Sequence, residues 1–127
     1  MAKILDYNYV GCEVRKDECD KINEMLNTNS LFEESDVRVL NMDCREFETD
    51  QKFDLVFTCP PYWNLETYSE QDNDLSSIAD YSDFLTEMSK VYSKCSSLMH
   101  DESYCCFVVA DFRDYSEGRK LINRLVP

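Results

Sequence analysis

Residues 53–63 (FDLVFTCPPYW) contain the side chains of this protein that are best suited to chemistry. An apolar run leads directly into Pro60 and Pro61, and each proline removes a backbone donor and fixes φ, so neither a strand nor a helix can continue through them. The sequence therefore predicts a strand that ends in a rigid turn, followed by the aromatic rings of Tyr62 and Trp63. A tight turn whose two rings pack in a core is the alternative interpretation of the same residues.

Two carboxylates follow other apolar runs. Glu13 comes at the end of residues 9–14 (YVGCEV) and before a predicted helix, which is where an acidic side chain holds the two hydroxyls of a ribose. Asp43 follows residues 37–40, where it could accept a hydrogen bond from an adenine amino group or cap the next turn. A surface or capping role is the alternative for both acids. Their common position after a strand nevertheless favours one shared binding edge.

The pattern along the chain alternates between strands and helices. Near-continuous apolar runs predict strands at residues 9–14, 37–40, 53–58 and 104–110. Apolar residues at helical spacing predict helices at residues 17–27 and from residue 80 to 98, the second with Asp80 or Ser82 as its N-cap. A last amphipathic segment covers residues 117–126, and the acidic residues 66–80 predict a mobile loop. This order predicts an α/β fold with a mainly parallel sheet, covered on both faces, whose ligands bind beyond the carboxyl ends of the strands.

Composition limits the classes of function. The 127 residues correspond to one domain, and 26 acidic against 13 basic residues give a net charge of −13. A negative field repels phosphate backbones, so a nucleic-acid role requires a local basic patch or a basic partner. The seven cysteines are odd in number, unevenly spaced and without a CxxC pair, and we expect no signal peptide. These features predict a reducing cytoplasm, no metal site and, since no apolar run approaches about 20 residues, no membrane span.

The CPPY segment and the segments around it resemble the DNA amino-methyltransferases that use S-adenosylmethionine. The signature of that family after its fourth strand is Asp, Asn or Ser, then Pro-Pro, then Tyr or Phe. Three further segments are similar to the family's second motif, third motif and later strand, respectively YVGCEVRKDECDKI, VRVLNMDCREF and YCCFVVADFRD. The resemblance covers almost the whole chain and implies a Rossmann-like methyltransferase fold.

The same resemblance implies roles for individual residues. The catalytic turn would be Cys59, Pro60, Pro61 and Tyr62, with the Pro60 carbonyl and Cys59 orienting the target amine and Tyr62 stacking on a flipped base. Trp63 and Tyr68 follow in a loop that could close over this base, although an aromatic residue there could equally serve packing.

The implied cofactor, S-adenosylmethionine, would be held by Glu13 at the ribose hydroxyls and by Asp43 at the adenine end, with Cys59 as a third cofactor-binding residue. No metal is implied.

Two departures from the family pattern affect these implications. Cys59 offers only a weak sulfur acceptor where the family has oxygen, and it decides neither the N6-adenine nor the N4-cytosine form of the signature. The family's first motif, a strand with a glycine-rich turn, should precede Tyr9, but the two glycines, Gly11 and Gly118, form no G-x-G. We therefore expect a fold truncated at the N-terminus, with residues 1–127 as a partial catalytic domain that lacks the central strand of its sheet. Such a gap leaves strand edges that pair directly, dimerise or take a strand from another polypeptide.

Three functions are compatible with the sequence. The first is a bacterial or phage DNA methyltransferase of restriction-modification type, complete in its catalytic core or a fragment of it, that methylates the exocyclic amine of adenine or cytosine. The second is a catalytically inactive, methyltransferase-like subunit or interaction module, whose partner is a second copy or a complementing methyltransferase subunit. The third is a methyltransferase acting on RNA or protein amides, which commonly has Asn before Pro-Pro-Tyr.

Overall fold

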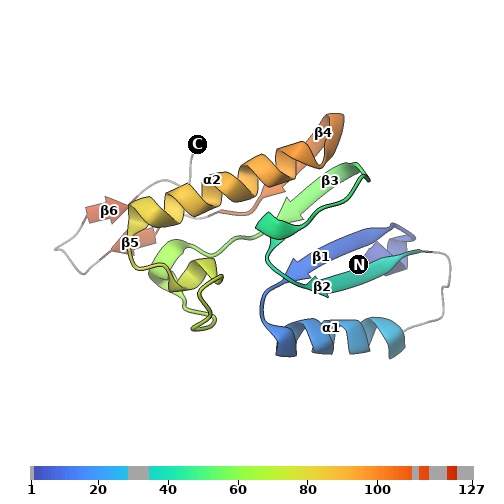
Figure 1. Cartoon of the computed structure of the whole chain (residues 1–127), viewed down its shortest axis with the longest axis horizontal. Helices are drawn as coiled ribbons and strands as arrows, with labels where there is room; N and C mark the ends of the chain where they lie inside the picture. The colour runs from blue at the N-terminus through green and yellow to red at the C-terminus, as the bar shows by residue number, and fades with distance from the viewer. Residues whose placement is uncertain (1, 29–34, 110–111, 115–119, 123–127) are drawn as a thin grey trace. The chain divides into compact units, whose positions relative to one another are not determined.

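The computed structural model describes residues 2–28, 35–109, 112–114 and 120–122, and the account below is of these residues (Figure 1). The chain divides into two compact units, Met1–Glu48 and Thr49–Pro127. Each unit has its own parallel strand pair and its own helix, and each is taken in turn.

The first unit is a strand, a helix and a parallel strand. After a 3-10 turn, η1 (Ala2–Leu5), come β1 (Tyr9–Glu13), α1 (Lys16–Thr28), β2 (Val37–Asn41) and a second 3-10 turn, η2 (Cys44–Glu46). β1 and β2 pair in parallel from Tyr9↔Val37 to Glu13↔Asn41. Helix α1 packs on β2, with Cys19 and Val39 buried between them. Both strands therefore end at the same edge, which is where the sequence predicts ligand-binding residues.

Asn23 of α1 closes the outer edge of β2. Its Nδ2 donates to the Val39 carbonyl at 2.8 Å, and its Oδ1 accepts from the Val39 amide at 3.1 Å. One side-chain amide thus supplies both hydrogen bonds that a neighbouring strand would supply. This protects an edge that would otherwise be open to pairing with another chain.

The second unit contains the remaining elements. They are β3 (Phe53–Thr58), η3 (Trp63–Leu65), η4 (Leu75–Ser77), α2 (Tyr81–Ser97), β4 (Met99–Phe107), β5 (Phe112–Asp114) and β6 (Lys120–Ile122). β3 and β4 form a parallel pair, and β5 and β6 form an antiparallel one. Helix α2 packs on β4, and its residues Phe84 and Met88 form a buried core with Trp63. The core therefore lies directly behind the CPPY turn.

The coarse fold expectation is confirmed, and several details differ. The chain is α/β, with parallel strand pairs and helices between strands. Among the described residues the parallel strands form two separate pairs, β1–β2 and β3–β4, so direct pairing of the two edges left by the missing central strand is not found. The last predicted strand begins five residues early, at Met99, and ends at Phe107. Of the amphipathic segment 117–126, only residues 120–122 lie inside the described part of the chain, and they form a strand.

One face of the β3–β4 pair lacks the helical cover expected on both faces. Leu55 and Phe57 of β3 lie in register with Tyr104 and Cys106 of β4, and all four side chains are exposed, Tyr104 by 75%. The opposite face packs on α2, where Tyr92 meets Phe107. Within the described residues a single helix, α2, packs on this pair, so only one of its faces is covered there.

Candidate functional site

The CPPY turn begins where β3 leaves the sheet. The Thr58 carbonyl accepts from the Val108 amide at 2.9 Å, and Cys59 is exposed immediately afterwards. Pro60 is buried, while Tyr62 remains partly exposed. The Cys59 sulfur and the Tyr62 hydroxyl lie 3.4 Å apart, so the two ends of the turn are in hydrogen-bond contact. This contact raises the pKa of Tyr62, with smaller contributions from burial and from the charges of Cys59 and Tyr68.

The residue after the turn has a strained backbone. Trp63 has a φ of 55°, in the left-handed region that bulky side chains rarely adopt. Strain of this kind costs about 1–3 kcal/mol and persists only where the surroundings hold it in place. The Trp63 side chain provides that hold, because it is 8% exposed, donates from Nε1 to the Ile78 carbonyl at 3.0 Å and packs on Tyr81 with ring centroids 5.1 Å apart. For Trp63 the structure thus favours packing over contact with a base, while Tyr62 keeps accessible surface.

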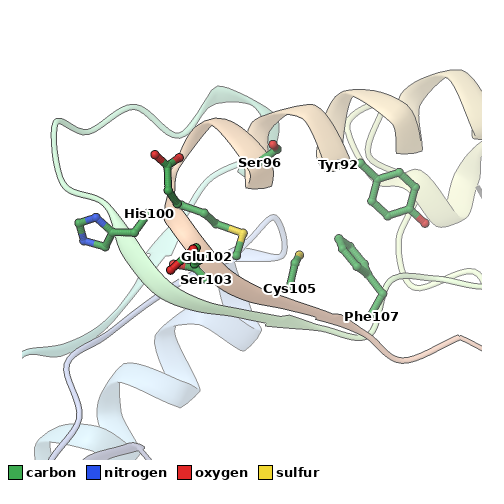
Figure 2. Close-up of a pocket in the computed structure, with 9 residues that line it drawn as sticks. Tyr92, Ser96, His100, Glu102, Ser103, Cys105 and Phe107 are labelled. Atoms are coloured by element: carbon green, nitrogen blue, oxygen red, sulfur yellow. The ribbon is translucent and has the colours of Figure 1, made fainter.

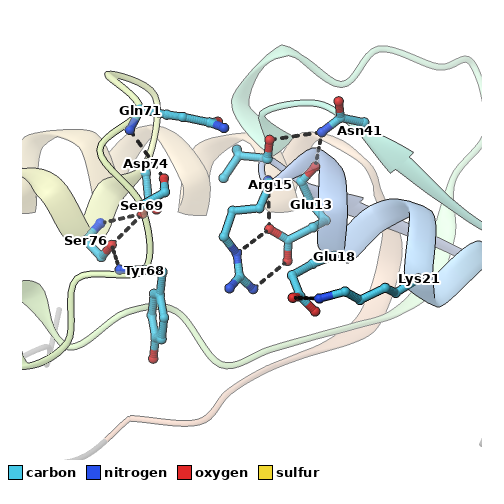
Figure 3. Close-up of polar contacts among 11 residues, drawn as sticks. Glu13, Arg15, Glu18, Lys21, Asn41, Tyr68, Ser69, Gln71, Asp74 and Ser76 are labelled. Carbon is cyan, nitrogen blue, oxygen red and sulfur yellow. Dashed lines mark hydrogen bonds and ion pairs between the residues drawn. The ribbon is translucent and has the colours of Figure 1, made fainter.

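The loop that follows, residues 66–80, has an internal structure that the sequence analysis did not anticipate (Figure 3). Asp74 is buried and accepts hydrogen bonds from the Ser76 amide at 2.9 Å, the Ser76 hydroxyl at 2.7 Å and the Ser69 hydroxyl at 2.7 Å. The sequence predicted a mobile loop here, and the structure adds that a buried carboxylate with three hydrogen bonds organises it. The sequence signal was Asp74 two residues before Ser76, which is the spacing of a capped turn.

Tyr68 is positioned by the same loop. Its amide donates to the Ser76 hydroxyl at 2.9 Å, and its own hydroxyl donates to Glu66 at 2.9 Å. Figure 3 shows its ring extending away from the Asp74 network, and the residue is 50% exposed. Tyr62, which is partly exposed, and Tyr68, which is exposed, are therefore the two tyrosines next to the Pro-Pro turn that keep accessible surface.

The predicted cofactor acids lie at the carboxyl ends of β1 and β2 in the first unit. Glu13 accepts from the Arg15 amide at 2.9 Å and from the Arg15 guanidinium at 3.0 and 3.3 Å, and its side chain is 22% exposed (Figure 3). Asn41 of β2 donates from Nδ2 to the Glu13 and Val14 carbonyls, each at 2.9 Å. These bonds fix the end of β1 and hold the Glu13 backbone in place.

Asp43 is more deeply buried than Glu13 and is fully engaged. It is 6% exposed, accepts from the Arg45 amide at 2.9 Å and pairs with the Arg45 guanidinium through both carboxylate oxygens. Burial alone would raise the pKa of Asp43, but the hydrogen bonds and charge of Arg45 outweigh it and lower the pKa. Burial raises the pKa of the neighbouring Cys12 to about 11, and the thiol of Cys44 and the charge of Asp43 add to this effect.

Both acids share a sequence pattern that our reading of the sequence missed. Each is followed two residues later by an arginine, as Glu13-Val14-Arg15 and as Asp43-Cys44-Arg45. In both cases the arginine folds back on the carboxylate. Acid-x-Arg directly after a strand was therefore the signal that these carboxylates carry an internal partner.

A cavity of about 460 Å³ lies between the end of α2 and β4 (Figure 2). Tyr92, Ser96, Cys105 and Phe107 line it, together with the start of β4. At this point the β3–β4 register shifts, and Glu102 adopts a φ of 65°. The sequence analysis assigned no role to these residues.

Comparisons with known proteins assign no function to these residues. No protein-family model, curated protein or solved structure matches the chain. No helix in the described part of the chain is long and apolar enough to cross a membrane.

Proposed function

We propose that this protein is the catalytic core, or a part of it, of an S-adenosylmethionine-dependent DNA methyltransferase that acts on the exocyclic amine of adenine or cytosine. The observation that carries the proposal is the CPPY turn, which follows the end of a parallel strand. The Cys59 sulfur and the Tyr62 hydroxyl lie 3.4 Å apart in it, and the buried Trp63, whose backbone is strained, holds the turn in place. The proposal includes a Rossmann-like arrangement of the strands and action in a reducing cytoplasm.

The residues fit the cofactor in part. Glu13 keeps an exposed edge, and its 3.3 Å bond to Arg15 is long, so a ribose hydroxyl can compete for this carboxylate. Asp43 has both oxygens on Arg45 and is buried, so an adenine amino group would have to displace a charged partner. In the proposed site Glu13 therefore contacts the cofactor, and Asp43 holds the end of β2 in place.

When bound, S-adenosylmethionine supplies an electrophilic methyl group on its sulfonium sulfur. The role of the chain is to position the amine, with the Pro60 carbonyl and the Cys59 sulfur as acceptors of its hydrogen bonds and Tyr62 as the stacking face for the base. The Cys59 sulfur is in contact with the Tyr62 hydroxyl, so the incoming amine replaces this hydroxyl. The negative charge of the chain requires that contacts to the DNA backbone come from a basic partner or another segment.

Calorimetric titration with S-adenosylhomocysteine, a non-reactive analogue, tests the cofactor site. We expect Glu13→Gln to weaken binding at least about tenfold, because a hydrogen bond to a charged group contributes about 1.5–3 kcal/mol. Glu18→Gln is the matched control, since Glu18 pairs with Lys21 on the surface of α1 (Figure 3). Equal loss of binding in both variants, or none in either, would remove Glu13 from the site.

Transfer of a radiolabelled methyl group to single-stranded and duplex DNA tests the target site. We expect Tyr62→Ala to abolish transfer and to leave the affinity for S-adenosylhomocysteine unchanged. Tyr104→Ala is the control, because Tyr104 is an exposed aromatic residue of β4 on the uncovered face. Transfer at the wild-type rate by Tyr62→Ala would exclude the stacking role.

A second candidate function, a methyltransferase-like subunit without activity of its own, is favoured by the open strand edges. Among the described residues β1 pairs only with β2, and β3 pairs only with β4. By the alternation of a parallel strand, the backbone groups of Val10, Cys12, Leu55 and Phe57 face away from those partners. A folded chain that fails to bind S-adenosylhomocysteine and whose mass in solution exceeds that of a monomer would favour this candidate.

A further inference from the structure

Helix α2 and strand β4 pack against each other through a short series of facing side chains. The rings of Tyr92 and Phe107 meet edge to face, with centroids 4.5 Å apart. The chain turns at Leu98, so β4 runs back along the helix that precedes it (Figure 1). One helical turn beyond Tyr92 therefore lies opposite the residues of β4 that come just before Phe107.

Two thiols meet at this position. Cys105 precedes Phe107 by two residues and shares its face of β4, and Cys95 follows Tyr92 by three residues on α2. Figure 2 shows Cys105 on the strand and Ser96 on the helix, and both residues line the cavity between them. The two positions face each other across the α2–β4 packing, and both cysteines are free thiols. Cys106, by contrast, belongs to the opposite, uncovered face of the strand.

We propose that Cys95 and Cys105 are a modification site, a thiol pair that exchanges with a small-molecule disulfide such as glutathione disulfide to form a disulfide between α2 and β4. In the first step the Cys105 thiolate attacks one sulfur of glutathione disulfide, which forms a mixed disulfide and releases one glutathione thiolate. In the second step the Cys95 sulfur, having lost its proton to solvent, attacks the Cys105 sulfur and releases the second glutathione. The protein dithiol is oxidised by two electrons, and one glutathione disulfide is reduced to two glutathiones.

The surroundings permit this reaction. Cys105 is exposed and Cys95 is partly exposed, so the reagent has access. The Tyr92–Phe107 contact holds α2 against β4 beside the two thiols, so the bond would join side chains on facing sides of the helix and the strand. Burial raises the pKa of the Cys105 thiol, and the charge of Cys106 adds to this, while the hydrogen bond from Cys95 opposes both. We therefore place the experiment at mildly alkaline pH, where more of the thiol is ionised.

The bond would close a loop that contains the irregular part of β4. This loop carries the register shift and Glu102 with its φ of 65°. A cross-link between its two ends restricts the unfolded chain and holds the bulge in place. The proposal concerns a site separate from the CPPY turn and does not depend on the proposed methyl transfer.

The test treats the full chain under native conditions with glutathione disulfide and measures its intact mass and its peptide map. We expect an intramolecular bond, seen as a loss of about 2 Da, that the map assigns to Cys95–Cys105. Cys95→Ser should stop the reaction at a glutathione adduct on Cys105, whereas Cys106→Ser, the matched control, should react like the wild type. Far-UV circular dichroism confirms that each variant is folded.

The proposal is overturned if the mapped bond joins Cys105 to Cys106. It is also overturned if the folded wild-type chain gains only glutathione adducts or only intermolecular dimers, or if Cys95→Ser still loses two hydrogens.

Discussion

At the scale of single residues, Trp63 links the candidate site to the core. Its backbone has a positive φ just after the Pro-Pro segment. The packing of its buried indole and one hydrogen bond to the Ile78 carbonyl offset the strain of that conformation. Tyr62, one residue earlier, is left partly exposed next to Cys59. Of the two adjacent rings, the one with the positive φ is therefore buried in the core and the other keeps accessible surface.

Replacement of Trp63 by phenylalanine tests this bracing role. Trp63→Phe retains an aromatic ring but removes the donor to the Ile78 carbonyl, so we expect a loss of about 1–3 kcal/mol in the free energy of unfolding. Urea unfolding followed by circular dichroism measures it. Tyr104→Phe is the control and should stay within about 0.5 kcal/mol of the wild type, because Tyr104 is exposed. Equal midpoints for the two variants would contradict the bracing role.

The sequence identified the turn but could not separate its two rings. Tyr62 and Trp63 are adjacent aromatic residues, and the structure places Trp63 in the core, where its backbone has a positive φ, while Tyr62 stays partly exposed. The same holds for Glu13 and Asp43, whose positions after strands were predictable, whereas their pairing with Arg15 and Arg45 depends on the guanidinium folding back. The sequence pattern was enough to locate these residues at the ends of strands. Whether their side chains are free to bind a ligand depends on contacts that only the structure shows.

At the scale of elements, the start of α2 decides between two predicted N-caps. Asp80 has extended backbone angles and accepts from the Asp83 amide at 3.0 Å, while Ser82 lies inside the first turn. We expect Asp80→Ala to lower the free energy of unfolding by about 1 kcal/mol, the usual cost of losing a cap. Ser82→Ala should change it by less than about 0.5 kcal/mol. Thermal unfolding of both variants makes the comparison, and a larger effect at Ser82 would reverse the assignment.

Most elements could be predicted because their apolar spacing is regular. β3 is found at the predicted residues, β1 and β2 differ from prediction by one residue at their last position, and the two helices differ by one residue at each end. β4 differs more, because residues 99–103 (MHDES) are polar and lack strand periodicity, yet Phe53 already pairs with Met99 before the register shifts. Asn23, a polar residue of α1 to which the sequence assigned no role, completes the edge of β2. Hydrogen bonds between elements, rather than the local sequence pattern, determine both the early start of β4 and the role of Asn23.

At the scale of the whole molecule, the chain forms two compact units with separate means of stabilisation. The first has α1 on its strand pair and the Asp43–Arg45 pair at its edge, and the second has the core around Trp63 and Phe84. The sequence predicted a mainly parallel sheet without its central strand, but the strand pattern alone does not say which edges pair, and the described strands form two separate parallel pairs. Trp63 is the only tryptophan, so fluorescence reports on the second unit and leaves the first to another probe.

Acid should therefore weaken the first unit through Asp43. The pKa of Asp43 in the folded chain is below its ordinary value of 3.8, so its stabilisation is fully present above pH 3.8 and is lost as pH falls through the lowered pKa. Asp43→Asn removes this contribution, so we expect it to cost about 1–3 kcal/mol at neutral pH and to flatten the dependence on pH below 3.8. Amide hydrogen exchange in β1 and β2 measures the first unit, and Trp63 fluorescence in urea measures the second. Because the two units have separate cores, Asp43→Asn should speed exchange in β1 and β2 without moving the Trp63 midpoint, whereas an equal shift of both probes would show that the units unfold as one.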